Sequence, residues 1–122
     1  MYKIPVSFED KESEKSKLVI VGVCGFTSID YINRRAEFSL YIAPAYQGND
    51  LGRGALRCLL KHGFKNLGFH LVWGEVFEEN PALQMFEELG FRRDGVRRDF
   101  YFRNGKFIDA HIISMKASEW KS

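Results

Sequence analysis

Apolar positions along this chain follow two spacings, one typical of strands and one typical of helices. A nearly continuous apolar run predicts a strand over 17–27, and a second strand over 36–42 ends before Pro44. Between 49 and 67 the apolar residues recur at helical spacing, and 70–77 again has the pattern of a strand. The predicted helical stripe consists of Leu51, Ala55, Leu56, Leu59, Leu60 and Phe64.

A second helix is predicted directly after the third strand. Asn80 is a favoured N-cap residue, Pro81 suits the first helical position, and Gly90 suits the position just past the last turn. The apolar face predicted for this helix consists of Ala82, Met85, Phe86 and Leu89. These signals together set both ends of the helix.

The chain ends in a predicted hairpin. Asn104-Gly105 is a two-residue turn signal between strands over 100–103 and 106–109, and the second strand continues to about 115. Residues 1–16 are polar and are expected to form a lead-in, with a fragment of strand near 2–6. The predicted order is strand, strand, helix, strand, helix, strand, strand, which is an α/β fold with helices packed on a sheet.

Composition indicates one compact domain covering residues 1–122. Hydrophobic residues make up 45% of the chain and the net charge is +2, so disorder and a nucleic-acid footprint are both disfavoured. A basic cluster is expected to be a solvated sheet face or the rim of an anionic-substrate site. It consists of Arg92, Arg93, Arg97, Arg98 and Arg103.

Cysteine content and hydropathy indicate where in the cell the protein is expected. Cys24 lies in a predicted strand and Cys58 in a predicted helix, and both are expected to be buried free thiols. The chain has no apolar run approaching ~18 residues and no signal-peptide pattern. We therefore expect a cytoplasmic protein that is not inserted in a membrane.

The stretch from Tyr46 to Ala55 carries the clearest chemical signal, because it is a glycine-rich turn between a strand and a helix. Unpaired N–H groups and the helix dipole favour an anion at such a helix start, and glycines let a phosphate approach the backbone. A Walker loop is excluded because Gly52 and Gly54 are followed by Arg53 and Ala55, and not by the Lys-Ser/Thr pair that such a loop needs. A dinucleotide fingerprint is excluded because Arg57 stands at its third glycine position.

The turn instead resembles the pyrophosphate loop of the GCN5-related N-acetyltransferases (GNAT), Gln/Arg-x-x-Gly-x-Gly/Ala. Gln47 matches the first position and Gly52 the last, whereas Asp50 stands at the family's first glycine. A carboxylate there is expected to repel a pyrophosphate unless it points away. The alternative is a plain glycine-rich turn without a ligand.

A second family motif, Asn-x-x-Ala-x-x-x-Tyr-x-x-x-Gly-Phe, is matched downstream. Asn80, Ala82, Gly90 and Phe91 correspond to its residues, with a one-residue difference in the spacing between Asn80 and Ala82, and Phe86 replaces the tyrosine. The two motifs stand in the family's order and separation, and the resemblance covers about residues 18–120. It implies a mixed, mostly antiparallel sheet with a splayed parallel strand pair and flanking helices. Full members also carry N-terminal helices, which this sequence is expected to lack.

The resemblance implies acetyl transfer from acetyl-CoA, as cosubstrate, to a primary amine, with no metal. Pantetheine is expected along Leu40, Tyr41 and Ile42. The remaining cofactor-binding residues expected from the motifs are Gln47, Gly48, Asn49, Leu51, Gly52, Arg53, Gly54, Asn80 and Phe86. The most similar branch acts on ribosomal-protein N-termini, polyamines and amino sugars, so the acceptor is expected to be a small-molecule or peptide amine.

Glu37 is the predicted catalytic base, since many relatives place a glutamate early in this strand. An ordinary surface carboxylate is the alternative for Glu37, and Glu75 and then His111 are the next candidates for the base. Because Phe86 has no hydroxyl, water or a tyrosine such as Tyr41 or Tyr101 would have to protonate the leaving thiolate.

Two other functions stay open at this point. The chain could be an acyl-CoA-binding module with weak or no catalysis, as Phe86 and Asp50 suggest. It could also be an oligomer, expected to be a homodimer, whose acceptor site forms between subunits. Exposed apolar surface and the aromatic-rich hairpin favour such an interface.

Overall fold

The computed structural model describes the backbone of residues 2–10, 15–47 and 50–121, and side chains from Gly22 onward within these ranges. Its strands are β1 Tyr2–Asp10, β2 Lys15–Asp30, β3 Arg35–Ile42, β4 Leu71–Phe77, β5 Arg92–Arg103 and β6 Lys106–Lys116. Its α-helices are α1 Leu51–Lys61 and α2 Ala82–Leu89. Short helical turns cover Pro44–Tyr46, His62–Asn66 and Ala117–Glu119.

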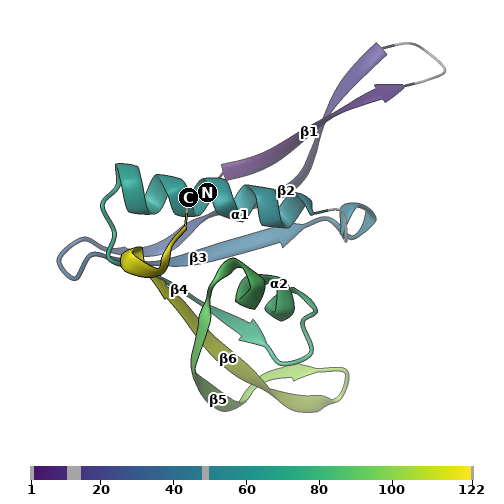
Figure 1. Ribbon diagram of the computed structural model, residues 1–122. Coiled ribbons are helices and arrows are strands. Elements are labelled where there is room, and N and C mark those ends of the chain that lie inside the picture. Colours follow the sequence, from purple (N-terminus) through teal and green to yellow (C-terminus); the bar gives the residue numbers. More distant parts are fainter. Residues whose placement is uncertain (1, 11–14, 48–49, 122) are drawn as a thin grey trace.

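The described strands form one sheet in the order β1-β2-β3-β4-β6-β5. Neighbouring strands are antiparallel except for β3 and β4, which run parallel and pair only from Arg35–Leu71 to Glu37–Trp73. Beyond Glu37 the two strands separate (Figure 1). This confirms the predicted mixed, mostly antiparallel sheet with a splayed parallel pair.

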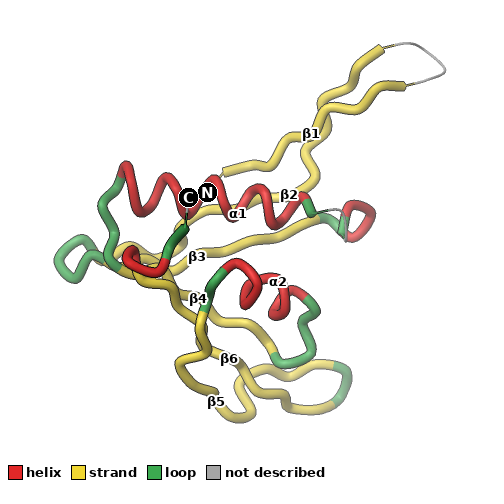
Figure 2. The backbone as a smooth tube through the Cα atoms, viewed as in Figure 1, coloured by secondary structure: helices red, strands yellow, loops and turns green. Residues whose placement is uncertain are grey.

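Both helices pack on the same face of the sheet (Figure 1, Figure 2). The largest fully buried side chains come from α1, β4 and β6, and they are Leu56, Leu60, Val72, Ile113 and Met115. The predicted stripe of α1 is confirmed, because each of its members belongs to or packs against this core. Burial of such side chains is the main stabilising contribution to the fold.

The N-terminal segment differs from the expected polar lead-in. It forms the edge strand β1, which pairs with β2 from Tyr2–Cys24 to Asp10–Lys15. The paired ends of β1 and β2 extend away from the rest of the sheet (Figure 1). A charged sequence can enter an antiparallel edge strand because backbone hydrogen bonds, rather than side chains, make the pairing. The predicted order therefore lacked one strand.

Two other boundaries were placed wrongly. β5 begins at Arg92 rather than near residue 100, because it pairs with β6 through two irregular segments that interrupt a simple alternation. The first helix was predicted over 49–67, but α1 ends at Lys61 and continues as a wider π-helical turn to Asn66. Asn49 lies outside the described residues.

The second helix begins one residue later than predicted, at Ala82. The capping role of Asn80 is confirmed, since its Oδ1 accepts a hydrogen bond from the Ala82 N–H at 2.9 Å. Gly90 is confirmed as the stop, with φ of 113°. Leu83 is buried with Phe86 and was missed in the predicted apolar face.

The two thiols also differ from each other. Cys24 is buried, as expected, and burial raises its thiol pKa. Cys58 is exposed, contrary to the prediction, because it lies on the outer side of α1. Both cysteines are free.

Candidate functional site

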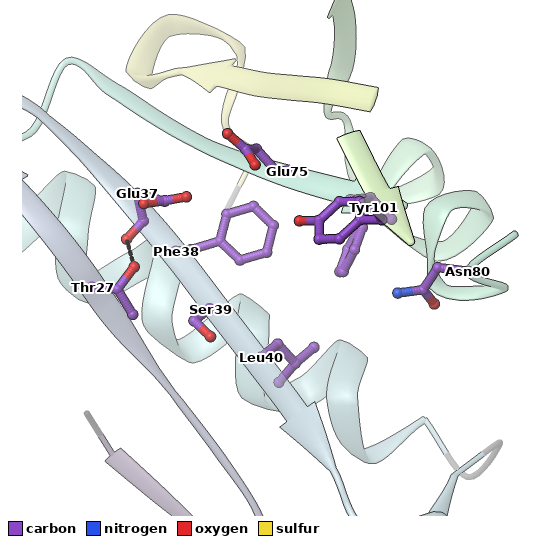
Figure 3. Close-up of a pocket in the computed structure, with 10 residues that line it drawn as sticks. Thr27, Glu37, Phe38, Ser39, Leu40, Glu75, Asn80 and Tyr101 are labelled. Carbon is purple, nitrogen blue, oxygen red and sulfur yellow. Dashed lines mark hydrogen bonds between the residues drawn. The ribbon is translucent and has the colours of Figure 1, made fainter. Parts of the chain in front are cut away.

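A cavity of about 200 Å³ opens where β3 and β4 separate. Ten residues line it, and they come from β2, β3, β4, the following loop, α2 and β5: Thr27, Glu37, Phe38, Ser39, Leu40, Glu75, Val76, Asn80, Phe86 and Tyr101 (Figure 3). The loss of pairing beyond Glu37 therefore creates a space between two halves of the sheet. The first half is β1-β2-β3 and the second half is β4-β6-β5.

Two carboxylates lie at this cavity. The pKa of Glu37 is raised by burial and then by the negative charge of Glu75, with Thr27 and the positive charge of Arg97 offsetting part of the effect. Arg97 Nε lies 3.8 Å from Glu75 Oε1, whose side chain is 18% exposed. A carboxylate with a raised pKa is better matched to proton abstraction near neutral pH than an exposed one.

The opposite wall of the cavity is mainly aromatic. Phe38 packs edge-on against Phe86 with ring centroids 5.3 Å apart, and both are largely buried. The Tyr101 hydroxyl points into the cavity from β5 (Figure 3). Asn80 uses its oxygen to cap α2, and its amide nitrogen is on the cavity side (Figure 3). The site thus combines a few aromatic and aliphatic side chains with a larger number of polar groups that face the cavity.

The loop before α1 is held by local contacts at both ends. Gln47 donates a hydrogen bond from Nε2 to the Ile42 carbonyl at 2.9 Å. Asp50 has φ of 59°, in the left-handed region that favours glycine, and its side chain makes no capping hydrogen bond. The Gly54 N–H donates to the Asp50 carbonyl at 3.1 Å, and so the N–H groups of 51–53 precede the first helical bond.

Arg53 joins this helix start to α2. Its Nη2 lies 2.6 Å from Glu88 Oε2, and its Nε lies 3.6 Å from Asp50 Oδ1. The Asp50 side chain is 87% exposed, so its carboxylate is on the solvent side of the turn. A Cβ at Gly52 would lie 3.3 Å from Leu40 Cδ2, and glycine there lets α1 approach the end of β3 closely.

The structure brings together several of the predicted residues. Glu37, Leu40, Asn80 and Phe86 line one cavity, and Glu75, the second candidate base, lines it too. The loop residues Gln47, Leu51, Gly52, Arg53 and Gly54 lie at the start of α1, and Gly48 and Asn49 lie outside the described residues. Ile42 is half-buried at the end of β3.

Other candidates are not at the cavity. Tyr41 is 56% exposed and is not a lining residue. His111 is buried on β6 between Val76 and Val96 and is not itself a lining residue, and among the described residues its Nδ1 has no hydrogen-bond partner. Thr27 and Ser39 were not predicted at all, since their positions depend on how the strands separate.

None of the helices in the described part of the chain is long and apolar enough to cross a bilayer. Among the side chains described in 22–47 and 50–121, no three His, Cys, Asp or Glu residues gather as a metal site would require.

Both the sequence and the fold of this chain are similar to those of known proteins. Residues 3–92 match the profile of a family described as "Acetyltransferase (GNAT) domain". A spermidine N(1)-acetyltransferase of Vibrio cholerae is 34% identical over 108 residues, which are 88% of this chain and 62% of that protein. This chain therefore spans about three fifths of the length of that curated relative.

Two solved structures are also similar to this chain in fold and sequence. A Vibrio cholerae spermidine N-acetyltransferase in complex with CoA and spermine aligns with a TM-score of 0.78 and 32% identity, over 83% of this chain and 60% of the other. A dodecameric structure of the Vibrio cholerae spermidine N-acetyltransferase aligns with a TM-score of 0.78 and 33% identity, over 82% of this chain and 59% of the other.

Proposed function

We propose that this chain, which belongs to the GNAT acetyltransferase family, moves an acetyl group from acetyl-CoA to a primary amine. The observation that carries the proposal is the cavity between β3 and β4, with Glu37 and Glu75 beside it. Acyl transfer needs a place for an extended thioester, a base for the amine and donors for the developing charge. The described residues supply candidates for each.

Acetyl-CoA would lie with its pyrophosphate at the start of α1 and its pantetheine along the separated end of β3. The N–H groups of Leu51, Gly52 and Arg53 precede the first helical hydrogen bond, which Gly54 makes, and they favour an anion there. Arg53 would weaken its ion pair with Glu88 and bind the phosphate of the ligand instead. Gln47 would hold the end of β3 in place through the Ile42 carbonyl.

The thioester would then reach the cavity beside Leu40, with the Asn80 amide nitrogen and Phe86 on the far side. Glu37 would take a proton from the amine as it attacks the carbonyl carbon. Its raised pKa comes from burial and from Glu75, and such a carboxylate holds a proton more readily than an exposed one. Glu75 would hold the ammonium form of the acceptor before it loses that proton.

The two carboxylates favour a small acceptor that carries positive charge. The relative that acts on spermidine and the structure with spermine bound are consistent with an aliphatic polyamine. A peptide N-terminus is the other acceptor that the family resemblance implies. We place the protein in the cytoplasm, where these amines and acetyl-CoA occur together.

We further propose that the protein self-associates, at least as a homodimer. Phe102 and Phe107 lie on the β5–β6 hairpin with 65% and 63% of their surface exposed, and their ring centroids are 5.0 Å apart. Exposed aromatic clusters are typical of interface cores. Light scattering over a concentration series tests this, and a constant mass near 14.1 kDa would contradict it.

Two observations favour a second candidate function, an acyl-CoA-binding module with weak or no catalysis. Phe86 lines the cavity without a hydroxyl, and Asp50 places a carboxylate at the anion-binding turn. A thiol-release assay with acetyl-CoA and a panel of amines separates the two functions. Amine-dependent release of CoA supports the transferase, whereas calorimetric binding of acetyl-CoA with no release supports the module.

Glu37→Gln tests the role of the base within the same assay. We expect turnover to fall by roughly 10²-fold while the KM for acetyl-CoA stays unchanged, because the substitution removes proton transfer and keeps the shape. Glu78→Gln is the matched control, since Glu78 is exposed and does not line the cavity. Unchanged turnover of Glu37→Gln on a verified acceptor would move the role to Glu75 or to solvent.

A further inference from the structure

Tyr101 is the one lining residue of the cavity that β5 contributes. Its ring stands against Phe77, with centroids 6.2 Å apart, and against Phe100, with centroids 5.5 Å apart. The two aromatic contacts fix the ring, and the hydroxyl points into the cavity (Figure 3). A phenol held in this way presents one O–H group to whatever occupies the cavity.

A bulge in β5 brings Tyr101 to this position. Arg97 pairs with Ala110 and Tyr101 pairs with Ile108, and so residues 98–100 of β5 lie opposite a single residue of β6. In an unbroken ladder Tyr101 would instead lie opposite Lys106, two residues farther along β6. At about 3.3 Å per residue, the bulge moves Tyr101 about 7 Å along the strand toward the cavity.

The bulge is built with a specific contact. Asp99 adopts φ of 51°, and its N–H donates to Asp109 Oδ1 at 2.9 Å. A non-glycine residue in the left-handed region costs conformational energy. A hydrogen bond from a neighbouring strand that offsets this cost indicates that the conformation serves a function. Here the conformation of Asp99 places Tyr101 at the cavity.

The other lining residues do not offer an equivalent proton. Glu37 and Glu75 are needed as carboxylates for the amine, and the Thr27 hydroxyl donates to the Glu37 carbonyl at 3.5 Å. The Asn80 amide donates hydrogen bonds but does not transfer protons. Hydroxyls of serine and threonine are far weaker acids than a phenol.

We propose that Tyr101 donates a proton to the sulfur of CoA when the thioester is cleaved, and that Asp109 positions it. This inference rests on the proposed acetyl transfer. The amine nitrogen bonds to the carbonyl carbon, the C–S bond breaks, and its electron pair stays on sulfur, which takes the Tyr101 proton. The proton that leaves the nitrogen passes to Glu37 and returns through solvent to the Tyr101 oxygen.

The electrostatics of the cavity agree with this role. Burial raises the pKa of Tyr101, and Glu75 and Glu37 add to the rise, so the hydroxyl is protonated near neutral pH. A cationic acceptor bound between the carboxylates would offset their charges and lower the Tyr101 pKa again. The donor would thus become more acidic when the reactants are in place.

Tyr101→Phe is the central variant, because it removes one oxygen and keeps the ring packing. We expect kcat for acetyl transfer to fall by about 10- to 100-fold with the KM for acetyl-CoA changed less than about threefold. Tyr31→Phe is the matched control, since Tyr31 is 70% exposed in the β2–β3 turn, and it should keep full activity. A Tyr101→Phe protein with the turnover of the parent would overturn the proposal.

A binding measurement tests the same contact without turnover. At pH 9, where most of the CoA thiol is ionised, the parent should bind CoA on the order of tenfold more tightly than desulfo-CoA, because a phenol O–H stabilises a thiolate. Tyr101→Phe should bind the two equally. A preference that survives in the variant overturns the role of Tyr101 alone, whereas a parent that binds no CoA overturns the proposed function and this inference together.

Asp109 gives a rescue test of positioning. Asp109→Asn keeps an oxygen that can accept from the Asp99 N–H, and it should retain most of the parent's kcat. Asp109→Leu removes the acceptor and should lower kcat toward that of Tyr101→Phe. Melting temperatures measured on both variants separate loss of fold from loss of position. Equal kcat in a folded Asp109→Leu protein would contradict the positioning role.

Discussion

Strands within each half of the sheet pair along most of their length, whereas the two strands at the junction between the halves pair over only a short stretch. β2 and β3 pair from Gly22–Ile42 to Asp30–Arg35, and β4 and β6 pair along the whole of β4. Between the halves, β3 and β4 share only the pairs from Arg35–Leu71 to Glu37–Trp73. The site lies at the junction because unpaired strand ends leave room for a ligand where continuous pairing does not.

Side chains rather than backbone bonds hold the halves together beyond this point. Phe38 of β3 packs against Phe86 and Phe91 of the second half, with ring centroids 5.3 and 5.1 Å apart. Arg53 of α1 pairs with Glu88 of α2 at 2.6 Å. The apolar contact is buried and the ion pair is exposed, so the aromatic contact contributes most of the stability.

The largest effect is expected from removing the aromatic contact. Phe38→Ala should lower the free energy of unfolding by about 3–5 kcal/mol, since Phe38 is 7% exposed and its loss leaves a cavity between the halves. Urea unfolding of parent and variant measures the difference. Phe102→Ala is the control, because Phe102 is 65% exposed, and a comparable loss there would show that the junction is not special.

A smaller effect is expected from crowding the same junction. A Cβ at Gly74 would lie 2.6 Å from Phe38 Cε1, so Gly74→Ala should cost about 1–3 kcal/mol of stability as the ring shifts. It should also weaken acetyl-CoA binding, because Phe38 lines the cavity. Gly54→Ala is the control, since a Cβ there meets no atom within 4 Å. Equal stability of the two variants would contradict the tight packing at Gly74.

The turn before α1 belongs to the first half and should respond to charge. Asp50→Gly should bind acetyl-CoA more tightly by on the order of 1 kcal/mol, because it removes a carboxylate near the proposed pyrophosphate site. It also relieves the left-handed conformation and leaves Arg53 freer of a counter-ion. Calorimetry at low and high salt should show the gain shrinking with salt. Weaker binding would mean that Asp50 stabilises the turn.

The last prediction concerns the pH dependence of kcat. It uses two variants in the second half of the sheet that should shift the Glu37 pKa in opposite directions. Glu75→Gln removes a negative charge that raises the Glu37 pKa, so the acid limb of kcat should move to lower pH. Arg97→Gln removes a positive charge that lowers the same pKa, so the limb should move to higher pH. The Tyr101 hydroxyl, which faces the same carboxylates, sets no acid limb. A shift of both variants in one direction would exclude Glu37 as the base.

Much of the fold was predictable because its signals are local. The Asn80 cap, the Gly90 stop and the apolar stripe of α1 each depend on residues within a few turns of one another. The splayed strand pair came from the family resemblance, and the structure confirms it. The length of β1 was underestimated, because the strand forms by pairing with β2 and does not depend on its own apolar content.

Within the site, residue identity was easier to predict than position. Glu37, Leu40, Asn80 and Phe86 were named from the family resemblance and lie at one cavity. His111 was a plausible base by its chemistry, but it is enclosed between two strands. Tyr101 was only one of two tyrosines that could have reached the sulfur.

The sequence by itself determined both helices, most of the strands and the chemical types available, because hydrophobic period, capping and turn residues act over short distances. Only the tertiary structure decided that Tyr101 rather than Tyr41 faces the cavity. That choice depends on a bulge in β5 whose Asp99 is held by Asp109 from the neighbouring strand. Pairing register is a cooperative property of two strands, and it therefore cannot be computed from either strand alone.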